Sequence, residues 1–210
     1  MSTYVAIPCM DQVPTEFMKN LLALKPQRGT AYGITVATLI YDARNILAKA
    51  AFETECDRVM WFDSDMIFDT DIMDRLSADI DEGRDFVTAL YFTRKNPVKP
   101  VIFKNSGYKV LPDGMKESYA GFYDDYPRDD IFEIDSAGFG ACMMTRRLLE
   151  EVYSNYGAPF APMPGFGEDI SFCKRCKDMG AKLYCDSKIR AGHIANMVVT
   201  QDTYDQQITL

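Results

Sequence analysis

The sequence predicts an α/β fold in which a mostly parallel central sheet is flanked by helices and a smaller mixed β region occupies the second half. Three observations predict it. Over the first 90 residues, short apolar runs alternate with segments of helical periodicity, a pattern typical of βα units around a parallel sheet. Between residues 95 and 135, β-like runs are instead separated by Pro, Gly and acidic residues. No linker-like stretch divides the 210 residues, which indicates a single domain over residues 1–200.

The first two βα units are expected between residues 4 and 56. Residues 4–8 form a short β-rich run, and Thr15 is expected to cap the helix that follows it. Residues 33–36 predict a second strand. An amphipathic stripe over residues 39–50 then predicts a helix that ends near Cys56.

The next two strands are expected on either side of a third helix. Residues 59–62 are wholly apolar, as in strands buried on both faces of a parallel sheet. Asp69 or Thr70 is expected to cap a helix with its apolar stripe over residues 72–80. Residues 86–91 predict the next strand, so the front half has βαβαβαβ order and helices on both faces of the sheet.

The second half predicts shorter strands and two further helices. Thr145 is expected to cap one helix, and Gly180 is expected to end the other. The predicted strands are residues 101–103, 108–111, 131–134, 141–144 and 182–185, and the predicted helices are residues 146–156 and 168–179, joined by a Pro- and Gly-rich loop over 157–167.

Charge and composition exclude several classes of protein. The chain has 23 Lys and Arg against 31 Asp and Glu, a formal charge of −8, which disfavours nucleic acid and anionic membranes as partners. No apolar segment is long enough for export or a membrane span, so a soluble cytoplasmic protein is expected. Residues 201–210 form a polar tail that fits a linker or docking segment. The six cysteines are expected to be buried and reduced: Cys9, Cys56, Cys142, Cys173, Cys176 and Cys185.

Asp63-Ser64-Asp65 is the sharpest chemical motif. It follows the apolar run 59–62 and therefore lies at the carboxyl end of a strand, where open α/β sheets bind ligands. Residues i and i+2 point to the same side, so both carboxylates can face one divalent cation. The alternative is that the two acids are solvated and only favour the start of the next helix.

Two further segments carry polar groups that suit a site. Glu168 and Asp169 follow two glycines at the start of a helix, where the helix dipole favours acids in any case and where glycine allows close backbone approach. His193, the only histidine, lies beyond the last predicted strand. It could return to the edge of the sheet and complete a site with Asp63 and Asp65.

The order of these three motifs resembles that of nucleotide-sugar glycosyltransferases of the GT-A (Rossmann-like) fold, and looks most like small members of virus or bacterial type. The resemblance covers residues 4–194. It implies a transferase that moves a sugar from a nucleoside-diphosphate donor, expected to be UDP-linked, to a hydroxyl of a glycan or glycoprotein. It also implies Mn²⁺ or Mg²⁺ as cofactor, the host cytoplasm as location if the source is viral, and a catalytic unit that could belong to a longer polypeptide.

The resemblance implies roles for individual residues. Asp65 and His193 would bind the metal, and Asp63 would contact the metal or the ribose. If the enzyme inverts, Asp169 would be the general base; if it retains, Glu168 and Asp169 would bind sugar hydroxyls instead. The remaining donor-binding residues would be Pro8, Cys9, Asp11, Arg44, Asn45 and Ser64, with Arg44 suited to stacking or phosphate pairing.

Two other segments are implied at the edge of the site. Residues 91–94 would shape the sugar pocket. Residues 137–141 resemble a glycine-containing segment below the acceptor, although a plain tight turn explains them equally well.

Other classes of protein remain open at this point. A Mg²⁺-dependent haloacid-dehalogenase-type phosphatase also carries D-x-D after an apolar strand, but normally on the first strand and with Thr or Val where Ile67 stands. A zinc module could use Cys173, Cys176, Cys185 and His193, although the first two fall inside a predicted helix. Nothing in the sequence favours a sugar-nucleotide-binding protein that has lost transfer.

Overall fold

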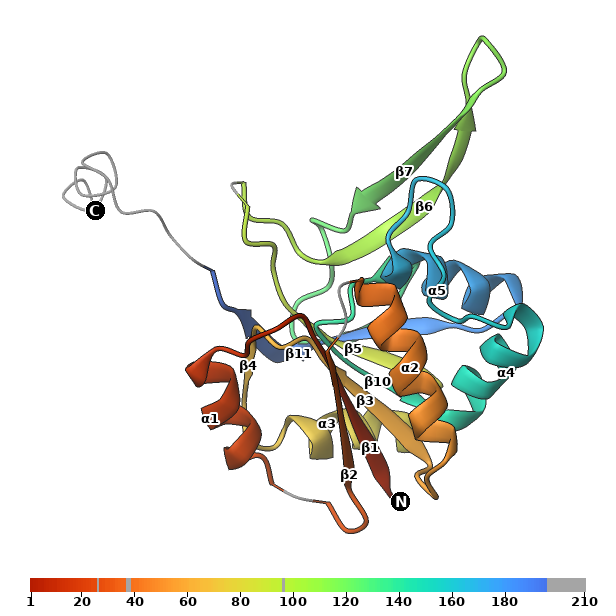
Figure 1. Ribbon diagram of the computed structural model, residues 1–210. Helices are drawn as coiled ribbons and strands as arrows, with labels where there is room; N and C mark the ends of the chain where they lie inside the picture. The colour runs from red at the N-terminus through yellow and green to blue at the C-terminus, as the bar shows by residue number, and fades with distance from the viewer. Residues whose placement is uncertain (26, 37–38, 96, 196–210) are drawn as a thin grey trace, which may run out of the picture.

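Eight strands form the central sheet of the computed structural model, in which residues 1–25, 27–36, 39–95 and 97–195 are described (Figure 1). The expected linker at residues 201–210 lies outside the described residues. The strand order is β2-β1-β3-β10-β5-β11-β4, and β8 pairs with β11. The bounds are β1 Thr3–Cys9, β2 Ala31–Val36, β3 Arg58–Phe62, β4 Met66–Phe68, β5 Phe86–Leu90, β8 Ile131–Ile134, β10 Ala141–Thr145 and β11 Leu183–His193.

Five of these strands run in the same direction, so the central sheet is mostly parallel, as predicted. Strands β2, β1 and β3 pair in parallel, and β5 pairs in parallel with β11. Strand β10 lies between β3 and β5 and is antiparallel to both, an insertion that the βαβαβαβ pattern does not reveal. Strands β4 and β8 are also antiparallel to β11.

Helices cover both faces of the sheet, and the alternation of side chains along β1 explains why. Tyr4 and Ala6 pack into a core shared with helices α2 (Ile40–Phe52), α4 (Arg146–Tyr156) and α5 (Glu168–Asp178). Val5 and Ile7 point the other way, into a second core with α1 (Thr15–Ala23) and α3 (Ile72–Asp81). A strand with apolar residues on both faces is buried on both faces.

A second, three-stranded sheet is the expected smaller β region. It contains β6 (Ile102–Val110), β7 (Lys116–Phe122) and β9 (Ser136–Ala137), and both of its pairings are antiparallel. The β6–β7 hairpin projects from the body of the molecule above α5 (Figure 1). Strand β6 joins two runs that the sequence suggests separately, and β7 is not predicted because its residues are largely polar and exposed.

Three of the predicted helix ends are wrong. Thr15 is the first residue of α1, which has no side-chain cap, and α3 follows Asp71 rather than a capping Asp69 or Thr70. Helix α2 ends at Phe52, before Cys56. Two other ends agree with prediction: Thr145 Oγ1 accepts a hydrogen bond from Leu148 N at 3.2 Å, and Gly180, with φ +84°, follows the end of α5.

All six cysteines are buried with free thiols. Five of them lie in the core shared with α2, α4 and α5, and Cys9 is buried at the end of β1, as expected from the sequence. Within the described part of the chain, none of the helices has the length and apolar character required to cross a membrane.

Candidate functional site

The Asp63-Ser64-Asp65 turn lies at the carboxyl end of β3 and leads directly into β4. Backbone hydrogen bonds fix both of its ends: Asp63 N donates to Gly140 O at 3.0 Å, and Ile194 N donates to Asp65 O at 2.8 Å. The turn is therefore held between the segment before β10 and the end of β11, two parts of the chain that are remote in sequence.

Arg44 connects this turn to the start of α5. Its Nη2 lies 2.7 Å from Asp63 Oδ1 and its Nε lies 3.1 Å from Glu168 Oε1, while its side chain is only 2% exposed. The guanidinium also lies over the rings of Trp61 and Phe139, at 5.7 and 5.2 Å from the ring centroids. Burial lowers the pKa of Arg44, but the carboxylates of Asp63 and Glu168 raise it overall, so the group stays charged.

The sequence expectation for Arg44 and Asn45 was contact with the nucleotide, and the structure gives both residues other partners. Arg44 is buried behind the turn, and Asn45 Oδ1 accepts a hydrogen bond from Phe160 N at 3.0 Å. A sequence signal for the burial of Arg44 does exist. Residues 44, 47, 48 and 51 are spaced i, i+3, i+4 and i+7, and Leu47, Ala48 and Ala51 are core residues.

His193 meets Asp65 at the edge of the sheet. Its Nε2 lies 3.4 Å from Asp65 Oδ2, and its Nδ1 donates to Phe92 O at 2.9 Å. Asp65 raises the pKa of His193, because its carboxylate accepts a hydrogen bond from the protonated imidazole. Burial acts to raise the pKa of Asp65, but His193 and Arg94 together lower it below its ordinary value. Because Nδ1 donates its hydrogen bond to the backbone, Nε2 is the ring nitrogen that faces the site.

Strand β11 explains how His193 reaches this position. The sequence predicts a strand that stops at Cys185, but β11 continues to His193 through an irregularity between Asp186 and Arg190. Its last residues pair with the short strand β4, which places His193 opposite Met66. Polar residues around the irregularity hide the strand pattern, and β4 has only three residues, so neither is visible in the sequence.

The residues present fit part of a divalent cation site. Among the described residues, no cluster of three or more His, Cys, Asp or Glu side chains has the arrangement of a complete metal site. Asp65 and His193 nevertheless present an oxygen and a nitrogen 3.4 Å apart. Adjacent ligands of a six-coordinate cation with bonds of about 2.1 Å lie roughly 3 Å apart. Mg²⁺ is commonly held by one or two protein groups together with substrate phosphates, so two protein ligands suffice.

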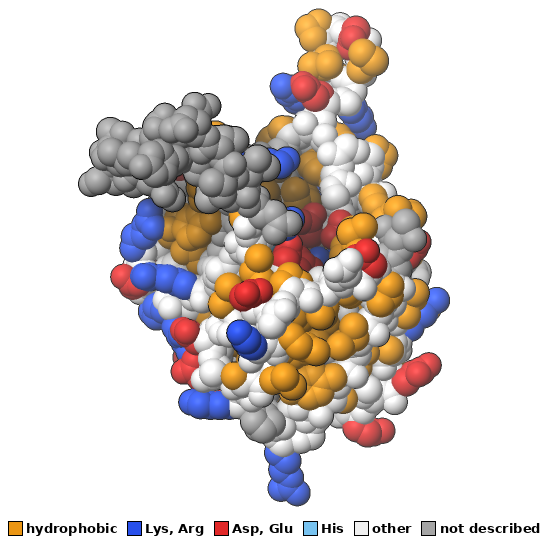
Figure 2. Space-filling view, turned by 60° about the vertical axis from the view of Figure 1, so that its left-hand side comes forward, with side chains coloured by type: hydrophobic (Ala, Val, Ile, Leu, Met, Phe, Trp, Pro, Cys, Tyr) orange, Lys and Arg blue, Asp and Glu red, His pale blue; other side chains and the backbone are white. Residues whose placement is uncertain are grey.

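A cavity of about 590 Å³ opens beside these residues. This volume lies in the range of small-molecule and cofactor sites. Of the residues proposed from the sequence, Asp11, Arg44, Asn45, Glu168 and Asp169 do not line it. Its lining residues are Pro8, Cys9, Met10, Leu39, Ile40, Tyr41, Asp63, Ser64, Asp65, Arg94 and His193. The space-filling view shows acidic side chains gathered in a hollow below the projecting hairpin (Figure 2).

The glycine-containing segment 137–141 packs against Tyr91 rather than forming an open turn. Gly140 N donates to the Tyr91 hydroxyl at 3.1 Å, and the Tyr91 ring lies edge-on to His193 at 5.7 Å between centroids. A Cβ on Gly140 would lie 2.8 Å from the Tyr91 ring and 3.0 Å from Met66 Sδ. Glycine at position 140 therefore gives room to the side chains that support His193 and the Asp63 turn.

Asp169 is the second acid at the start of α5. Burial, and then the charge of Glu168, raise its pKa to about 6. Its Oδ1 accepts a hydrogen bond from Ile170 N at 2.7 Å, and a Cβ on Gly167 would lie 2.8 Å from the same oxygen. A carboxyl group with a pKa near 6 can act as a base at neutral pH.

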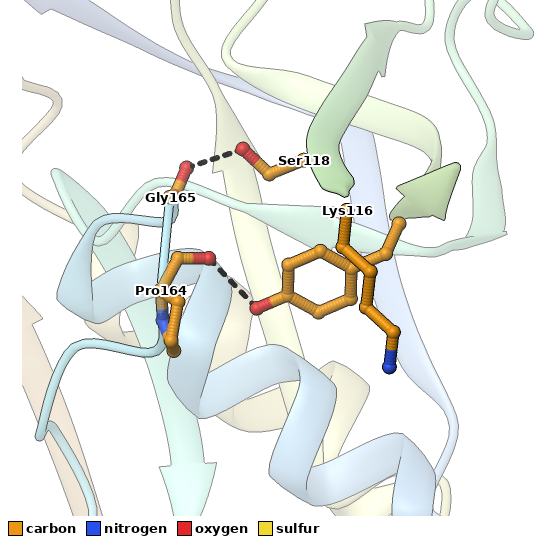
Figure 3. Close-up of a pocket in the computed structure, with 5 residues that line it drawn as sticks. Lys116, Ser118, Pro164 and Gly165 are labelled. Carbon is orange, nitrogen blue, oxygen red and sulfur yellow. Dashed lines mark hydrogen bonds between the residues drawn. The ribbon is translucent and has the colours of Figure 1, made fainter. Parts of the chain in front are cut away.

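The β6–β7 hairpin holds the loop that leads to Glu168. The Tyr108 hydroxyl donates to Pro164 O at 2.7 Å, and Ser118 Oγ donates to Gly165 O at 2.9 Å (Figure 3). A cavity of about 400 Å³ lies at this junction, with Lys116 on its wall. Sequence reasoning missed this part of the structure, because β7 was not predicted.

Comparison with known proteins identifies the fold. No protein-family model matches the sequence, and no curated protein does. Among solved structures, A197 from STIV matches with a TM-score of 0.64 and 19% identity over 93% of this chain and 87% of that chain. GalNAc-T7 with UDP, GalNAc and Mn²⁺ matches with a TM-score of 0.61 and 11% identity, over 99% of this chain and 47% of that chain. S. aureus TarS 1–349 matches with a TM-score of 0.57 and 15% identity, over 92% of this chain and 60% of that chain. GalNAc-T7 and TarS are GT-A glycosyltransferases. The chain has the GT-A fold.

The GT-A fold agrees with the expected fold class, although this chain spans only 47% and 60% of the GalNAc-T7 and TarS chains. It places the D-x-D turn after β3, whereas the phosphatase alternative has its motif on the first strand. The structure also disfavours the zinc alternative. Cys173, Cys176 and Cys185 lie together in the core, whereas His193 pairs with β4 beyond the irregularity in β11 and lies against Asp65.

Proposed function

We propose that the chain is a metal-dependent glycosyltransferase that transfers a sugar from a nucleoside-diphosphate donor, UDP-linked by preference, to a hydroxyl of a glycan or glycoconjugate. The convergence of Asp65 and His193 at the wall of a 590 Å³ cavity carries the proposal. The GT-A fold supports it, as does the presence of UDP and Mn²⁺ with GalNAc-T7, a protein of the same fold.

The residues of the cavity have distinct roles in this proposal. Asp65 and His193 hold Mn²⁺ or Mg²⁺, which when bound offsets the charge that develops on the departing diphosphate. One carboxylate oxygen of Asp63 is held by Arg44, and the side chain is 30% exposed on the cavity wall, where it can contact a ribose hydroxyl. The backbone and side chains of Pro8, Cys9 and Ser64 complete the wall against which the nucleoside lies.

Asp169 is the proposed general base. The acceptor oxygen forms a bond to the anomeric carbon as the bond from that carbon to the phosphate oxygen breaks, and the electron pair leaves with the diphosphate. Asp169 takes the proton of the acceptor hydroxyl. Its raised pKa, near 6, suits this role because the group is ionised at pH 7 and still basic. Glu168, tied to Arg44, keeps the start of α5 in place.

A thermal-shift screen of nucleotide sugars with and without Mn²⁺ tests the proposal, since a ligand that binds the native state raises its melting temperature. At least one UDP-sugar should stabilise the protein only when Mn²⁺ is present, and Asp65→Ala should remove that stabilisation. Asp69→Ala is the matched control, because Asp69 lies nearby and is 74% exposed. A protein that no nucleotide sugar stabilises, with or without metal, would contradict the function.

A further inference from the structure

Arg94 contacts the same carboxylate oxygen that a metal ion requires. Its Nη1 lies 2.7 Å from Asp65 Oδ2, and His193 Nε2 lies 3.4 Å from that oxygen. All three side chains line the 590 Å³ cavity. Arg94 is 50% exposed, whereas Asp65 is 25% and His193 18% exposed. Of the three groups, Arg94 is the one with space to move.

A divalent cation and the Arg94 guanidinium are competitors for this oxygen. Like charges within a few ångströms repel, and the cavity wall screens them less than bulk water does. His193 is held in place by its Nδ1 hydrogen bond to Phe92 O and by the pairing of β11 with β4. Among the described residues, Arg94 makes only the ion pair with Asp65. Cation binding must therefore displace Arg94.

The loop that carries Arg94 is anchored at its base, so a displaced side chain stays at the cavity. Thr93 N donates to Lys99 O at 2.8 Å and Val101 N donates to Tyr91 O at 2.9 Å, and each bond joins the segment before Arg94 to the segment after it. A guanidinium has a planar set of donors that matches phosphate oxygens. The diphosphate of a donor bound at the metal would lie within reach of this group.

We infer that Arg94 is a displaceable counter-ion: it neutralises Asp65 in the absence of metal, and once a cation binds it turns to the diphosphate of the donor. This inference rests on the function proposed above and adds to it a coupling between the two ligands. Metal alone binds weakly because it breaks the Arg94–Asp65 pair. Metal with nucleotide binds more tightly because Arg94 gains a new partner, so each ligand strengthens the other.

Binding of Mn²⁺ alone, followed by electron paramagnetic resonance in the absence of nucleotide, tests the inference. Arg94→Ala should bind Mn²⁺ about tenfold more tightly than the wild type, and should bind UDP about tenfold more weakly at saturating Mn²⁺. The factor by which UDP strengthens Mn²⁺ binding should fall accordingly. Arg147→Ala is the control for net charge, because Arg147 is an exposed arginine on α4 paired with Asp85 and Glu151. It should change neither affinity.

The outcomes separate this inference from the proposed function. If wild type binds Mn²⁺ through Asp65 and Arg94→Ala binds it equally well, the displacement is wrong and the metal site stands. If Arg94→Ala binds Mn²⁺ where wild type shows none, the displacement is supported. If neither protein binds Mn²⁺ even when UDP is present, both the metal dependence and the role of Arg94 are overturned.

Discussion

Arg44 holds Asp63 at 2.7 Å from a position almost completely inside the protein. Through its second contact, with Glu168, it ties the D-x-D turn after β3 to the acidic start of α5. The two acidic motifs lie about a hundred residues apart in sequence, between positions 63 and 168, and one side chain fixes their relative position.

Replacing Arg44 with alanine should destabilise the fold. Removal of one partner from a buried ion pair leaves the carboxylates without compensation, at a cost of about 3–5 kcal/mol. Urea denaturation would measure the loss in free energy of unfolding. Arg147→Ala is the matched control, since exposed pairs contribute about 0–1 kcal/mol. Equal losses for the two variants would contradict the bridging role.

Tyr108→Phe should loosen the loop before Glu168 without unfolding the protein. It removes only the hydroxyl that donates to Pro164 O, and one such hydrogen bond contributes about 1 kcal/mol. Amide hydrogen exchange at residues 163–169 should become faster. Tyr119→Phe, on the same hairpin, should leave this exchange unchanged. Unaltered exchange in Tyr108→Phe would show that the hairpin does not hold the loop.

His193→Gln should abolish Mn²⁺-dependent hydrolysis of the donor while leaving the fold intact. Glutamine has similar length but lacks the imidazole Nε2 that faces Asp65. Donor hydrolysis and circular dichroism together check this, with wild type as reference. Full Mn²⁺-dependent hydrolysis in the variant would exclude His193 as a ligand.

The sequence was sufficient for the order of strands and helices in the front half apart from β4, because residues 59–62 and 86–91 are apolar runs whose strand character depends on local composition. It could not place His193, because β11 is interrupted near Asp186 and its end is fixed by pairing with β4. The buried position of Arg44 has a local signal, the stripe shared with Leu47, Ala48 and Ala51. A charged residue is not normally counted in an apolar stripe, so the signal is easily missed. The burial of Arg44 is explained by Asp63 and Glu168, whose carboxylates the tertiary fold brings to it.

Gly140→Ala should cost about 1–3 kcal/mol, the usual range for overpacking a close-packed core. Its Cβ would approach the Tyr91 ring to 2.8 Å and Met66 Sδ to 3.0 Å. Thermal denaturation measures the change. Gly192→Ala is the control, because a Cβ there meets Ile67 Cβ at an ordinary 3.5 Å. A Gly140 variant as stable as the Gly192 variant would mean that Tyr91 moves aside without cost.

Turnover should rise with pH through the pKa of Asp169, which burial and Glu168 raise to about 6. Only the ionised carboxylate can accept the acceptor proton, so kcat at pH 5 should be about tenfold below its plateau. Glu168→Gln removes the neighbouring negative charge, which lowers the pKa of Asp169 and moves the rising limb to lower pH. Glu151→Gln, on the exposed face of α4, should leave the pH dependence of kcat unchanged.

Asp169→Asn should lower kcat far more than donor affinity, because a base acts on the acceptor after the donor has bound. Asp169 would be excluded as the base if kcat of Glu168→Gln rose at the same pH as in the wild type. A selective loss of donor affinity in Asp169→Asn would also exclude it.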